Sequence, residues 1–256
     1  MAELPKTLED AIAQSTEAVK SALADGVTRI QVELLFPELK FMTVAEQFLP
    51  QFTEYESRLK VFFADAGAAA LARRDWTDAQ FQISDIGTGR AASLAAKIQP
   101  EDEIFLFIAP TSVEVPQLEK LCELIGERPV IMLTPRLEDS SIVGIGYAAR
   151  ETRRRFISTI ESCYYIRPVD DQSALFRCYP GLWEIWLETE GEYQKITELP
   201  KKPSGDELDA ILLGKGENTT DSTPAKKSSV FKSLQRFIKA LSLSLIHISE
   251  PTRQAE

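Results

Sequence analysis

Two short segments in which every residue is apolar place the strongest constraint on the fold of this chain. Ile104–Ile108 reads Ile-Phe-Leu-Phe-Ile and Val130–Leu133 reads Val-Ile-Met-Leu, and a helical pattern over Val115–Ile125 separates them. A strand that is apolar on both sides must be covered on both sides, which is typical of a parallel sheet flanked by helices. These residues therefore predict a β-α-β unit.

Helix and strand patterns alternate on the N-terminal side of this unit as well. Thr7 is a typical N-cap, and the apolar residues after it recur at helical spacing as far as Gly26. A second helical pattern covers Val44–Phe52, and an Ala-rich one ends near Leu71. Strand patterns rich in β-branched and aromatic residues cover Val27–Phe36, Leu59–Ala64 and Phe81–Ile86. The alternation predicts an α/β fold with a doubly wound, mainly parallel, Rossmann-like sheet.

The pattern changes after an Arg-rich helical segment that begins at Ala148 and ends near Ile157. The strand patterns that follow are joined by turns too short for a parallel crossover. They cover Ser162–Pro168, Ala174–Tyr179, Leu182–Glu188 and Tyr193–Leu199. We therefore expect a C-terminal antiparallel meander that extends an edge of the sheet or forms a lid over it.

Composition divides the chain into four parts. Residues 1–200 are expected to form a single α/β domain. Residues 201–225 are rich in Pro, Gly, Ser and Thr and are expected to form a flexible linker, which contains a short apolar island at Leu208–Leu213. Residues 226–242 have the pattern of a basic amphipathic helix. Residues 243–256 resemble a translated sequencing adapter, so we expect them to be an artefact.

The formal net charge of -10 makes general affinity for nucleic acid unfavourable, so no nucleic-acid partner is expected. The chain has neither a run of eighteen apolar residues nor a secretory signal, and we expect a cytoplasmic protein. Its cysteines are Cys122, Cys163 and Cys178, which form no C-x-x-C pair and lie among apolar residues. We expect all of them to be buried as small hydrophobic side chains.

The sequence contains no recognisable catalytic set. Its one histidine, His247, falls in the adapter-like segment, so a zinc site and a histidine-based triad are unavailable. We therefore expect no catalytic residues, no metal and no cofactor, and a binding or assembly role rather than an enzyme.

Loops that follow the predicted parallel strands are the candidate ligand sites, because ligands of such sheets bind where strands end. Ala109–Ser112 forms one of these loops. The other two loops follow the strand patterns Leu59–Ala64 and Phe81–Ile86. Their candidate ligand-binding residues are Asp65, Gly67, Asp85, Gly87, Gly89 and Arg90. Neither a G-x-G-x-x-G nor a Walker pattern is present. Ordinary helix caps are the preferred explanation of the aspartates, and a small-ligand or nucleotide site is the alternative interpretation.

Two segments are candidate partner contacts. Arg150 and Arg154 share one face of the Arg-rich helix, where they either bind an anionic group or belong to a solvated face. The predicted hairpin carries Arg177, Tyr179, Trp183 and Trp186. Because the tryptophans are three residues apart, they are expected on opposite sides of a strand, where one contacts a partner or both pack on the sheet.

The basic segment at residues 226–242 carries cations and no acidic residue. Its apolar residues follow helical spacing, which suits weak, reversible contact with an anionic membrane, and docking onto the acidic domain is the alternative. The residues selected as a membrane tether are Lys227, Phe231, Lys232, Leu234, Arg236, Phe237 and Lys239.

Four segments carry a resemblance to a known family. They are residues 4–9 (Leu-Pro-Lys-Thr-Leu-Glu), residues 29–39, residues 144–150 and residues 177–180 (Arg-Cys-Tyr-Pro). Over residues 4–199 the chain resembles an uncharacterised-domain family of cyanobacteria and chloroplasts. That family includes a plant Low Photosystem II Accumulation factor and a domain fused to a chloroplast adenylate kinase.

The resemblance implies a photosynthetic source and a non-enzymatic accessory role in photosystem II assembly, with photosystem II subunits as partners. It also implies a location in the cytoplasm or peripherally on the thylakoid membrane. The adenylate kinase fusion keeps a nucleotide-linked alternative open, since one fold serves many functions.

Overall fold

The computed structural model describes residues 3–87, 94–138 and 147–216 of the chain. Within these residues the strands are β1 (Arg29–Leu34), β2 (Leu59–Phe63), β3 (Gln82–Asp85), β4 (Ile104–Ile108), β5 (Val130–Leu133), β6 (Glu161–Pro168), β7 (Ser173–Cys178), β8 (Trp183–Thr189) and β9 (Glu192–Leu199). They form one sheet in the order β3-β2-β4-β5-β1-β6-β7-β8-β9. The fully apolar segments predicted as buried strands, β4 and β5, are neighbours near its centre.

The sheet has a parallel part and an antiparallel part. Strands β1 to β6 pair in parallel, with Phe105 opposite Val130 and Leu59 opposite Ile104 in the register. Strands β6 to β9 pair in antiparallel order. The predicted doubly wound, mainly parallel α/β sheet with a C-terminal meander is therefore confirmed, and the meander extends the sheet at its β6 edge.

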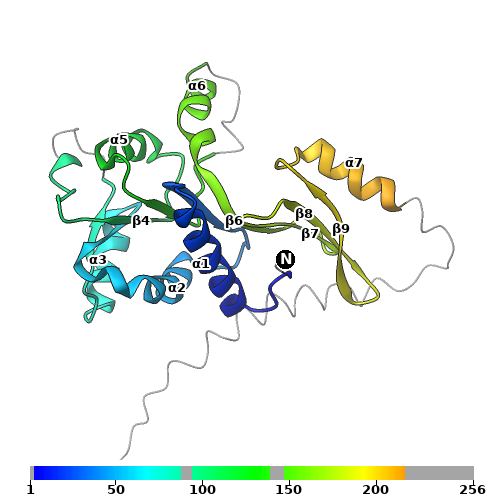
Figure 1. Cartoon of the computed structure of the whole chain (residues 1–256), viewed down its shortest axis with the longest axis horizontal. Coiled ribbons are helices and arrows are strands. Elements are labelled where there is room, and N and C mark those ends of the chain that lie inside the picture. Colours follow the sequence, from blue (N-terminus) through cyan, green and yellow to red (C-terminus); the bar gives the residue numbers. More distant parts are fainter. Residues whose placement is uncertain (1–2, 88–93, 139–146, 217–256) are drawn as a thin grey trace, which may run out of the picture.

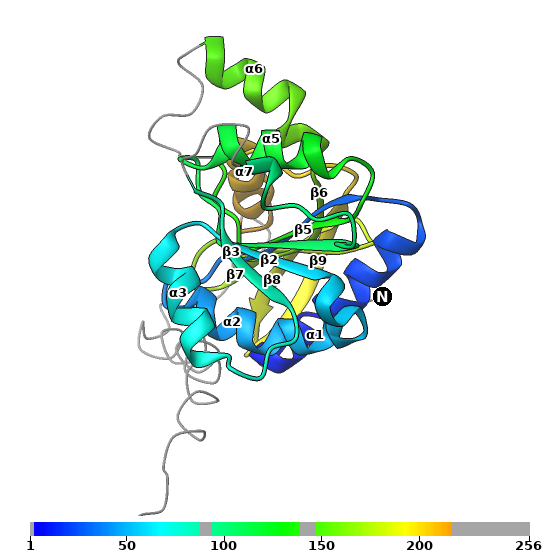
Figure 2. The ribbon, with the colours of Figure 1, turned by 90° about the vertical axis from the view of Figure 1, so that its left-hand side faces the viewer.

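Helices cover both faces of the sheet (Figures 1 and 2). Helices α1, α2 and α3 lie below the sheet in the view of Figure 1, and α5, α6 and α7 lie above it. The helical segments are α1 (Leu8–Ala24), α2 (Phe41–Phe48), the 3-10 segment η1 (Leu49–Arg58), α3 (Ala66–Asp75), α5 (Val115–Ile125), α6 (Tyr147–Arg155), the 3-10 segment η2 (Ile157–Thr159) and α7 (Gly205–Gly216).

The predicted ends of α1 and α5 agree with the structure. The Thr7 hydroxyl accepts a hydrogen bond from the Asp10 amide at 3.0 Å, and the Asp10 carboxylate accepts one from the Thr7 amide at 3.0 Å. This reciprocal capping box satisfies amides that the first turn leaves unpaired. Helix α5 ends at Gly126, whose φ of 69° lies in the left-handed region that favours glycine.

The helix predicted over Val44–Phe52 differs in the structure. The α-helical part is α2, which ends at Phe48, and a 3-10 segment continues to Arg58. Pro50 lies in the first turn of η1 and has no amide hydrogen to donate, so it cannot continue the hydrogen-bond ladder of α2. The resulting change of direction positions the cleft described below.

Apolar side chains form a core on each face of the sheet. The lower core packs β-strand residues such as Val32 and Val61 against α1, α2 and α3. In the upper core, Phe62 and Phe107 stack at 4.9 Å between ring centroids beneath α5. Adjacent residues of a strand point to opposite faces, so an uninterrupted apolar strand serves both cores at once.

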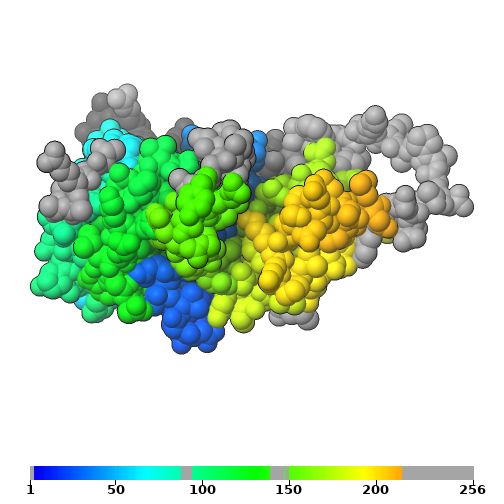
Figure 3. Space-filling model, turned by 90° about the horizontal axis from the view of Figure 1, so that it is seen from above, coloured from blue at the N-terminus to red at the C-terminus, as the bar shows by residue number. Residues whose placement is uncertain are grey.

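The prediction of a flexible linker at residues 201–225 is wrong for its first part. Residues 205–216 form helix α7, shown in orange above the antiparallel part of the sheet in Figures 1 and 3. Leu208 is 2% exposed and packs in a third apolar cluster with Tyr165 and Trp183. The apolar island at Leu208–Leu213 therefore belongs to a helix that packs through Leu208, Ile211 and Leu212 on a surface supplied by the meander.

Several predictions concern residues outside the described ranges. They include Gly89 and Arg90 of the loop after β3, the rest of the predicted linker, the basic segment at residues 226–242 with its seven selected residues, and the adapter-like segment. In the part of the chain that the structure describes, no helix combines the length and the hydropathy needed to cross a membrane.

Candidate functional site

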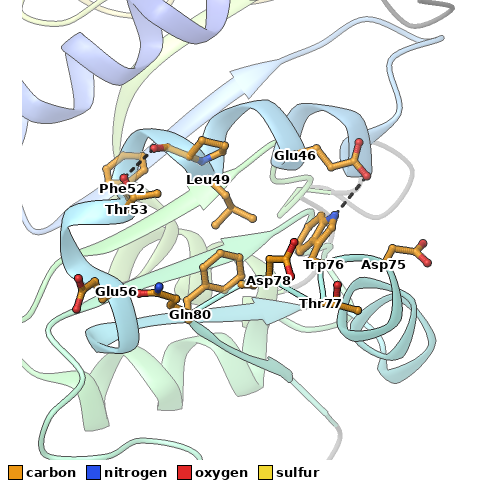
Figure 4. Close-up of a pocket in the computed structure, with 13 residues that line it drawn as sticks. Glu46, Leu49, Phe52, Thr53, Glu56, Asp75, Trp76, Thr77, Asp78 and Gln80 are labelled. Carbon is orange, nitrogen blue, oxygen red and sulfur yellow. Dashed lines mark hydrogen bonds between the residues drawn. The ribbon is translucent and has the colours of Figure 1, made fainter. Parts of the chain in front are cut away.

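A cleft of about 570 Å³ opens below the sheet, between α2 with η1 on one side and the α3–β3 connection on the other (Figure 4). We call it the aromatic cleft. Its lining residues are Glu46, Leu49, Pro50, Phe52, Thr53, Glu56, Asp75, Trp76, Thr77, Asp78, Ala79, Gln80 and Phe81. Clefts of this size, with apolar walls and a few polar groups, are typical binding sites.

Trp76 is held in the wall of this cleft by contacts on several sides. It follows α3 directly, and its amide donates to the Ala72 carbonyl at 2.8 Å. Its ring is tilted against Phe63 at 5.7 Å and meets Phe81 edge-on at 6.3 Å. The indole Nε1 donates to the Glu46 carboxylate at 3.3 Å, as Figure 4 shows. The ring is thus fixed in place before any ligand arrives.

The far end of the cleft carries a strained residue. Glu56 has a φ of 48° and a ψ of -124°, in the kink of η1. A non-glycine residue at positive φ costs on the order of 1 kcal/mol or more and persists only where its surroundings hold it. Such residues gather at functional sites. Glu56 is exposed and is drawn at the opposite end of the cleft from Glu46 in Figure 4.

The charged side chains that line the aromatic cleft are all carboxylates: Glu46, Glu56, Asp75 and Asp78. Arg74 pairs with Asp75 at 2.6 Å; this hydrogen bond lowers the pKa of Asp75, and the guanidinium offsets part of its negative charge. Asp78 lies beside Trp76 in the close-up (Figure 4). Carboxylates around an aromatic ring attract a cation, and an ammonium or guanidinium group near a tryptophan face adds a cation–π attraction.

A second cavity, of about 250 Å³, lies where β1, β2, β4 and β5 end. We call it the strand-end crevice. Its lining residues are Leu34, Leu35, Leu39, Phe41, Ala64, Asp65, Ala68, Ile108, Ala109, Thr111, Thr134 and Arg136. The structure therefore brings together two of the predicted ligand loops, those at Asp65 and at Ala109.

Asp65 has the helix-capping role considered for it from the sequence, and it also lines the strand-end crevice. Its Oδ1 atom accepts a hydrogen bond from the Ala68 amide at 2.9 Å and so caps α3, and the same residue lines the crevice. A side chain at Gly67 would place its Cβ 3.0 Å from Asp65 Oδ1, which explains the glycine without a ligand.

The loop after β3 is occupied by a side chain of the protein itself. Lys97 Nζ donates to the Asp85 carbonyl at 2.7 Å, to the Asp85 carboxylate at 3.2 Å and to the Ile86 carbonyl at 3.4 Å. Gly87 has a φ of 73°, and a Cβ there would come within 3.0 Å of Lys97 Nζ and 2.8 Å of Asp85 Oδ2. The described part of this loop, Asp85 to Gly87, thus binds an internal cation.

Most of the cations on α6 are paired with carboxylates of the protein. Arg154 pairs with Glu151 at 2.6 Å, and the neighbouring Arg153 and Arg155 pair with Glu138 at 2.7 Å and Glu119 at 2.6 Å. Arg150 is exposed. Because these carboxylates offset the positive charge, α6 presents less of an anion-binding surface than its sequence indicates.

The hairpin residues predicted as partner contacts make internal contacts in the structure. Trp183 is 4% exposed, beneath Lys202 and α7, so it is unavailable to a partner while α7 is docked. Arg177 pairs with Glu161 at 2.5 Å, and Tyr179 donates to Asp25 at 2.9 Å. Trp186 lies on the opposite side of β8 from Trp183, as its spacing predicted, and packs against the lower core.

The buried thiols are unsuited to nucleophilic chemistry. Burial raises the pKa of Cys122 and of Cys163 to about 12, and that of the half-buried Cys178 to about 11. All three are therefore protonated at neutral pH, and protonated thiols react poorly. Within the described ranges, the acidic and sulfur-bearing side chains form no group of three or more that could hold a metal ion.

Topology and the two cavities define the class of this protein: a mixed α/β domain with a Rossmann-like sheet that is extended by a meander. Residues 5–210 match a family described as Domain of unknown function (DUF1995), and the chain belongs to that family. The match extends into α7, which supports counting this helix as part of the domain. No solved structure matches the chain.

Several residues of these sites carry no recognisable signal in the sequence. Trp76 and Asp78 come from the α3–β3 connection and Glu56 comes from η1, two segments that meet only in the folded chain, and no motif marks these residues. Thr134 and Arg136 were missed because the loop after β5 contains no glycine. What distinguishes this loop is its backbone conformation, since Thr134 has a φ of 49°. Sequence patterns do not reveal such a conformation.

Proposed function

We propose that this protein is a non-enzymatic accessory factor that binds a basic segment of a protein partner in the aromatic cleft. The observation that carries this proposal is the lining of the cleft, where a fixed tryptophan and apolar side chains lie among carboxylates and none of the described lining residues is a cation. A segment in which Lys or Arg stands beside an apolar residue complements both properties. Its apolar side chain fills the space next to Phe52 and Leu49, and its cation faces Trp76 and Asp78.

The proposed setting is photosystem II assembly at the thylakoid membrane of a cyanobacterium or chloroplast. Two observations support this setting. Residues 5–210 match the family named above, and the sequence resembles proteins of photosynthetic organisms. The basic segment at residues 226–242 complements an anionic membrane surface by its charge, and a short segment of this kind gives weak, reversible attachment. The protein would then work peripherally, beside its partner.

Affinity capture from detergent-solubilised thylakoids tests this function. The bait is residues 1–242, and the cleft variant is Asp78→Lys, which reverses an exposed charge of the lining. The matched control is Asp209→Lys, which makes the same change on the exposed side of α7, outside the cleft lining. Because only the cleft variant repels a cation from Trp76, we expect photosystem II subunits with the wild type and the control, and about tenfold less with Asp78→Lys.

Equal thermal unfolding of the variants shows that each bait is folded. Capture of photosystem II subunits that is the same for all three baits would refute the cleft as the docking site. Absence of these subunits from every capture would refute the assembly role itself.

A further inference from the structure

The strand-end crevice lies where the sheet topology favours a ligand. After β1 and β2 the chain passes to the lower face through α2 and α3, whereas after β4 and β5 it passes to the upper face through α5 and α6 (Figure 1). Since β2 neighbours β4 and β1 neighbours β5, connections leave in opposite directions from adjacent strands. Crevices at such switch points, outside the carboxyl ends of the strands, are the usual binding sites of open α/β sheets.

Two strained residues shape this crevice. Ala109 follows β4 and Thr134 follows β5, and each has a φ of 49° although neither is a glycine. The Ala109 amide donates to the Leu133 carbonyl at 2.8 Å, and the Arg136 amide to the Pro110 carbonyl at 2.7 Å, so each loop holds the other in this conformation. Backbone strain that is maintained on adjacent loops marks a site where the side chains must be aimed.

A polar atom in the crevice wall lacks a partner. Thr134 Oγ1 is buried and has no hydrogen bond to any of the described residues. An unpaired buried hydroxyl destabilises the folded state, so a native protein usually satisfies it or uses it. Thr134 lines the crevice and is half-buried, so rotation about its χ1 bond would bring the hydroxyl, which is inaccessible in its present rotamer, to the surface of the crevice, where it can donate to an acceptor oxygen of a bound molecule.

The rest of the lining indicates which molecule fits. Arg136 is exposed at the mouth, and a guanidinium group binds carboxylates in a two-pronged geometry. Leu34, Leu39 and Phe41 form an apolar wall. Asp65 disfavours a ligand with a second negative charge, and a volume of about 250 Å³ is below the range for drug-sized ligands such as nucleotides.

From these observations we infer that the strand-end crevice binds a small organic monoanion, a carboxylate with a short apolar body. The carboxylate pairs with Arg136 and accepts a hydrogen bond from Thr134 Oγ1, and the apolar body lies against the leucines and Phe41. This site is separate from the aromatic cleft and does not depend on the partner proposed for it.

Titration followed by amide chemical shifts tests the inference. The probe is 3-phenylpropionate, and its matched controls are 3-phenylpropan-1-ol, which has the apolar body without the charge, and inorganic phosphate, which has charge without the body. We expect the probe to shift the amides of Ala109 and Thr134 at millimolar concentrations, with at least about tenfold weaker effects from both controls.

Two variants separate binding from folding. Thr134→Val keeps the shape of the side chain and removes the unpaired hydroxyl, so we expect a protein of equal or greater stability that binds the probe about fivefold more weakly. Arg136→Gln should weaken binding about tenfold, and Arg150→Gln on α6 should leave it unchanged. Absence of shifts with the probe, or binding that both crevice variants retain, would overturn the inference. Binding of phosphate or the alcohol as strongly as the probe would overturn the assigned ligand class.

Discussion

Glu33 is a buried carboxylate on β1, in the middle of the sheet. It is 8% exposed, Ser162 Oγ donates to its Oε2 at 2.5 Å, and Lys202 Nζ lies 3.8 Å from its Oε1. Burial raises the pKa of Glu33 above its ordinary value of 4.5, and Lys202 and Ser162 only partly oppose this. Desolvation of the ionised form thus outweighs the favourable contacts.

This raised pKa predicts a pH dependence of stability. The folded state binds the Glu33 proton more tightly than the unfolded state, so the contribution of this group is complete below the unfolded pKa and is lost as the pH rises through the folded pKa. We therefore expect the free energy of unfolding of the wild type, relative to Glu33→Gln, to increase as the pH falls from neutral towards the ordinary pKa of 4.5. Urea titrations at several pH values measure this difference.

Glu190→Gln is the matched control, since Glu190 is exposed in the turn between β8 and β9. The difference in free energy of unfolding between the wild type and Glu190→Gln should stay constant over the same pH range. If the difference in free energy of unfolding between the wild type and Glu33→Gln also stays constant with pH, or changes in the opposite direction, the explanation by burial is contradicted.

Helix α7 shows at the scale of an element what sequence patterns predict and what they miss. Strands β4 and β5 were predicted from their apolar residues alone, because a strand buried on both faces has few alternatives. Helix α7 follows a segment with Pro203 and Ser204 and begins at Gly205, which together are typical of a linker. Its stability comes from packing on Tyr165 and Trp183, and no local pattern reports a surface that distant strands provide.

The packing of α7 predicts unequal effects of two leucines on the same helix. Leu208 is 2% exposed and Leu213 is 72% exposed. Leu208→Ala should lower the free energy of unfolding by about 2–4 kcal/mol because it leaves a cavity, and Leu213→Ala should change it by less than about 0.5 kcal/mol. Urea unfolding measures both values.

Tryptophan fluorescence gives a second measurement on the same variants. Loosening of α7 uncovers Trp183, so the emission of Leu208→Ala should shift to longer wavelength, and that of Leu213→Ala should not. Equal effects of the two substitutions on stability and emission would show that α7 does not pack as described.

At the scale of the whole molecule, the order of elements was predictable and the sites were largely not. Parallel strands and their connecting helices follow from patterns within about ten residues. The aromatic cleft joins η1 to the α3–β3 connection, and the strand-end crevice joins the ends of four strands, so each requires the fold to be known first. Asp65 was found from the sequence because its loop follows a strand and contains a glycine, whereas the loop at Thr134 contains no glycine and Asp78 does not follow a strand.

Photo-crosslinking at the aromatic cleft is the most direct test of the central claim. A benzoylphenylalanine replaces Thr77, an exposed lining residue, and in a second protein it replaces Leu213 on α7, outside the cleft lining. After illumination with solubilised thylakoids, we predict crosslinks from position 77 to a basic segment of a photosystem II subunit and none to that segment from position 213. Crosslinks to the same segment from both positions, or none from position 77, would contradict the claim that the aromatic cleft is the partner-binding site.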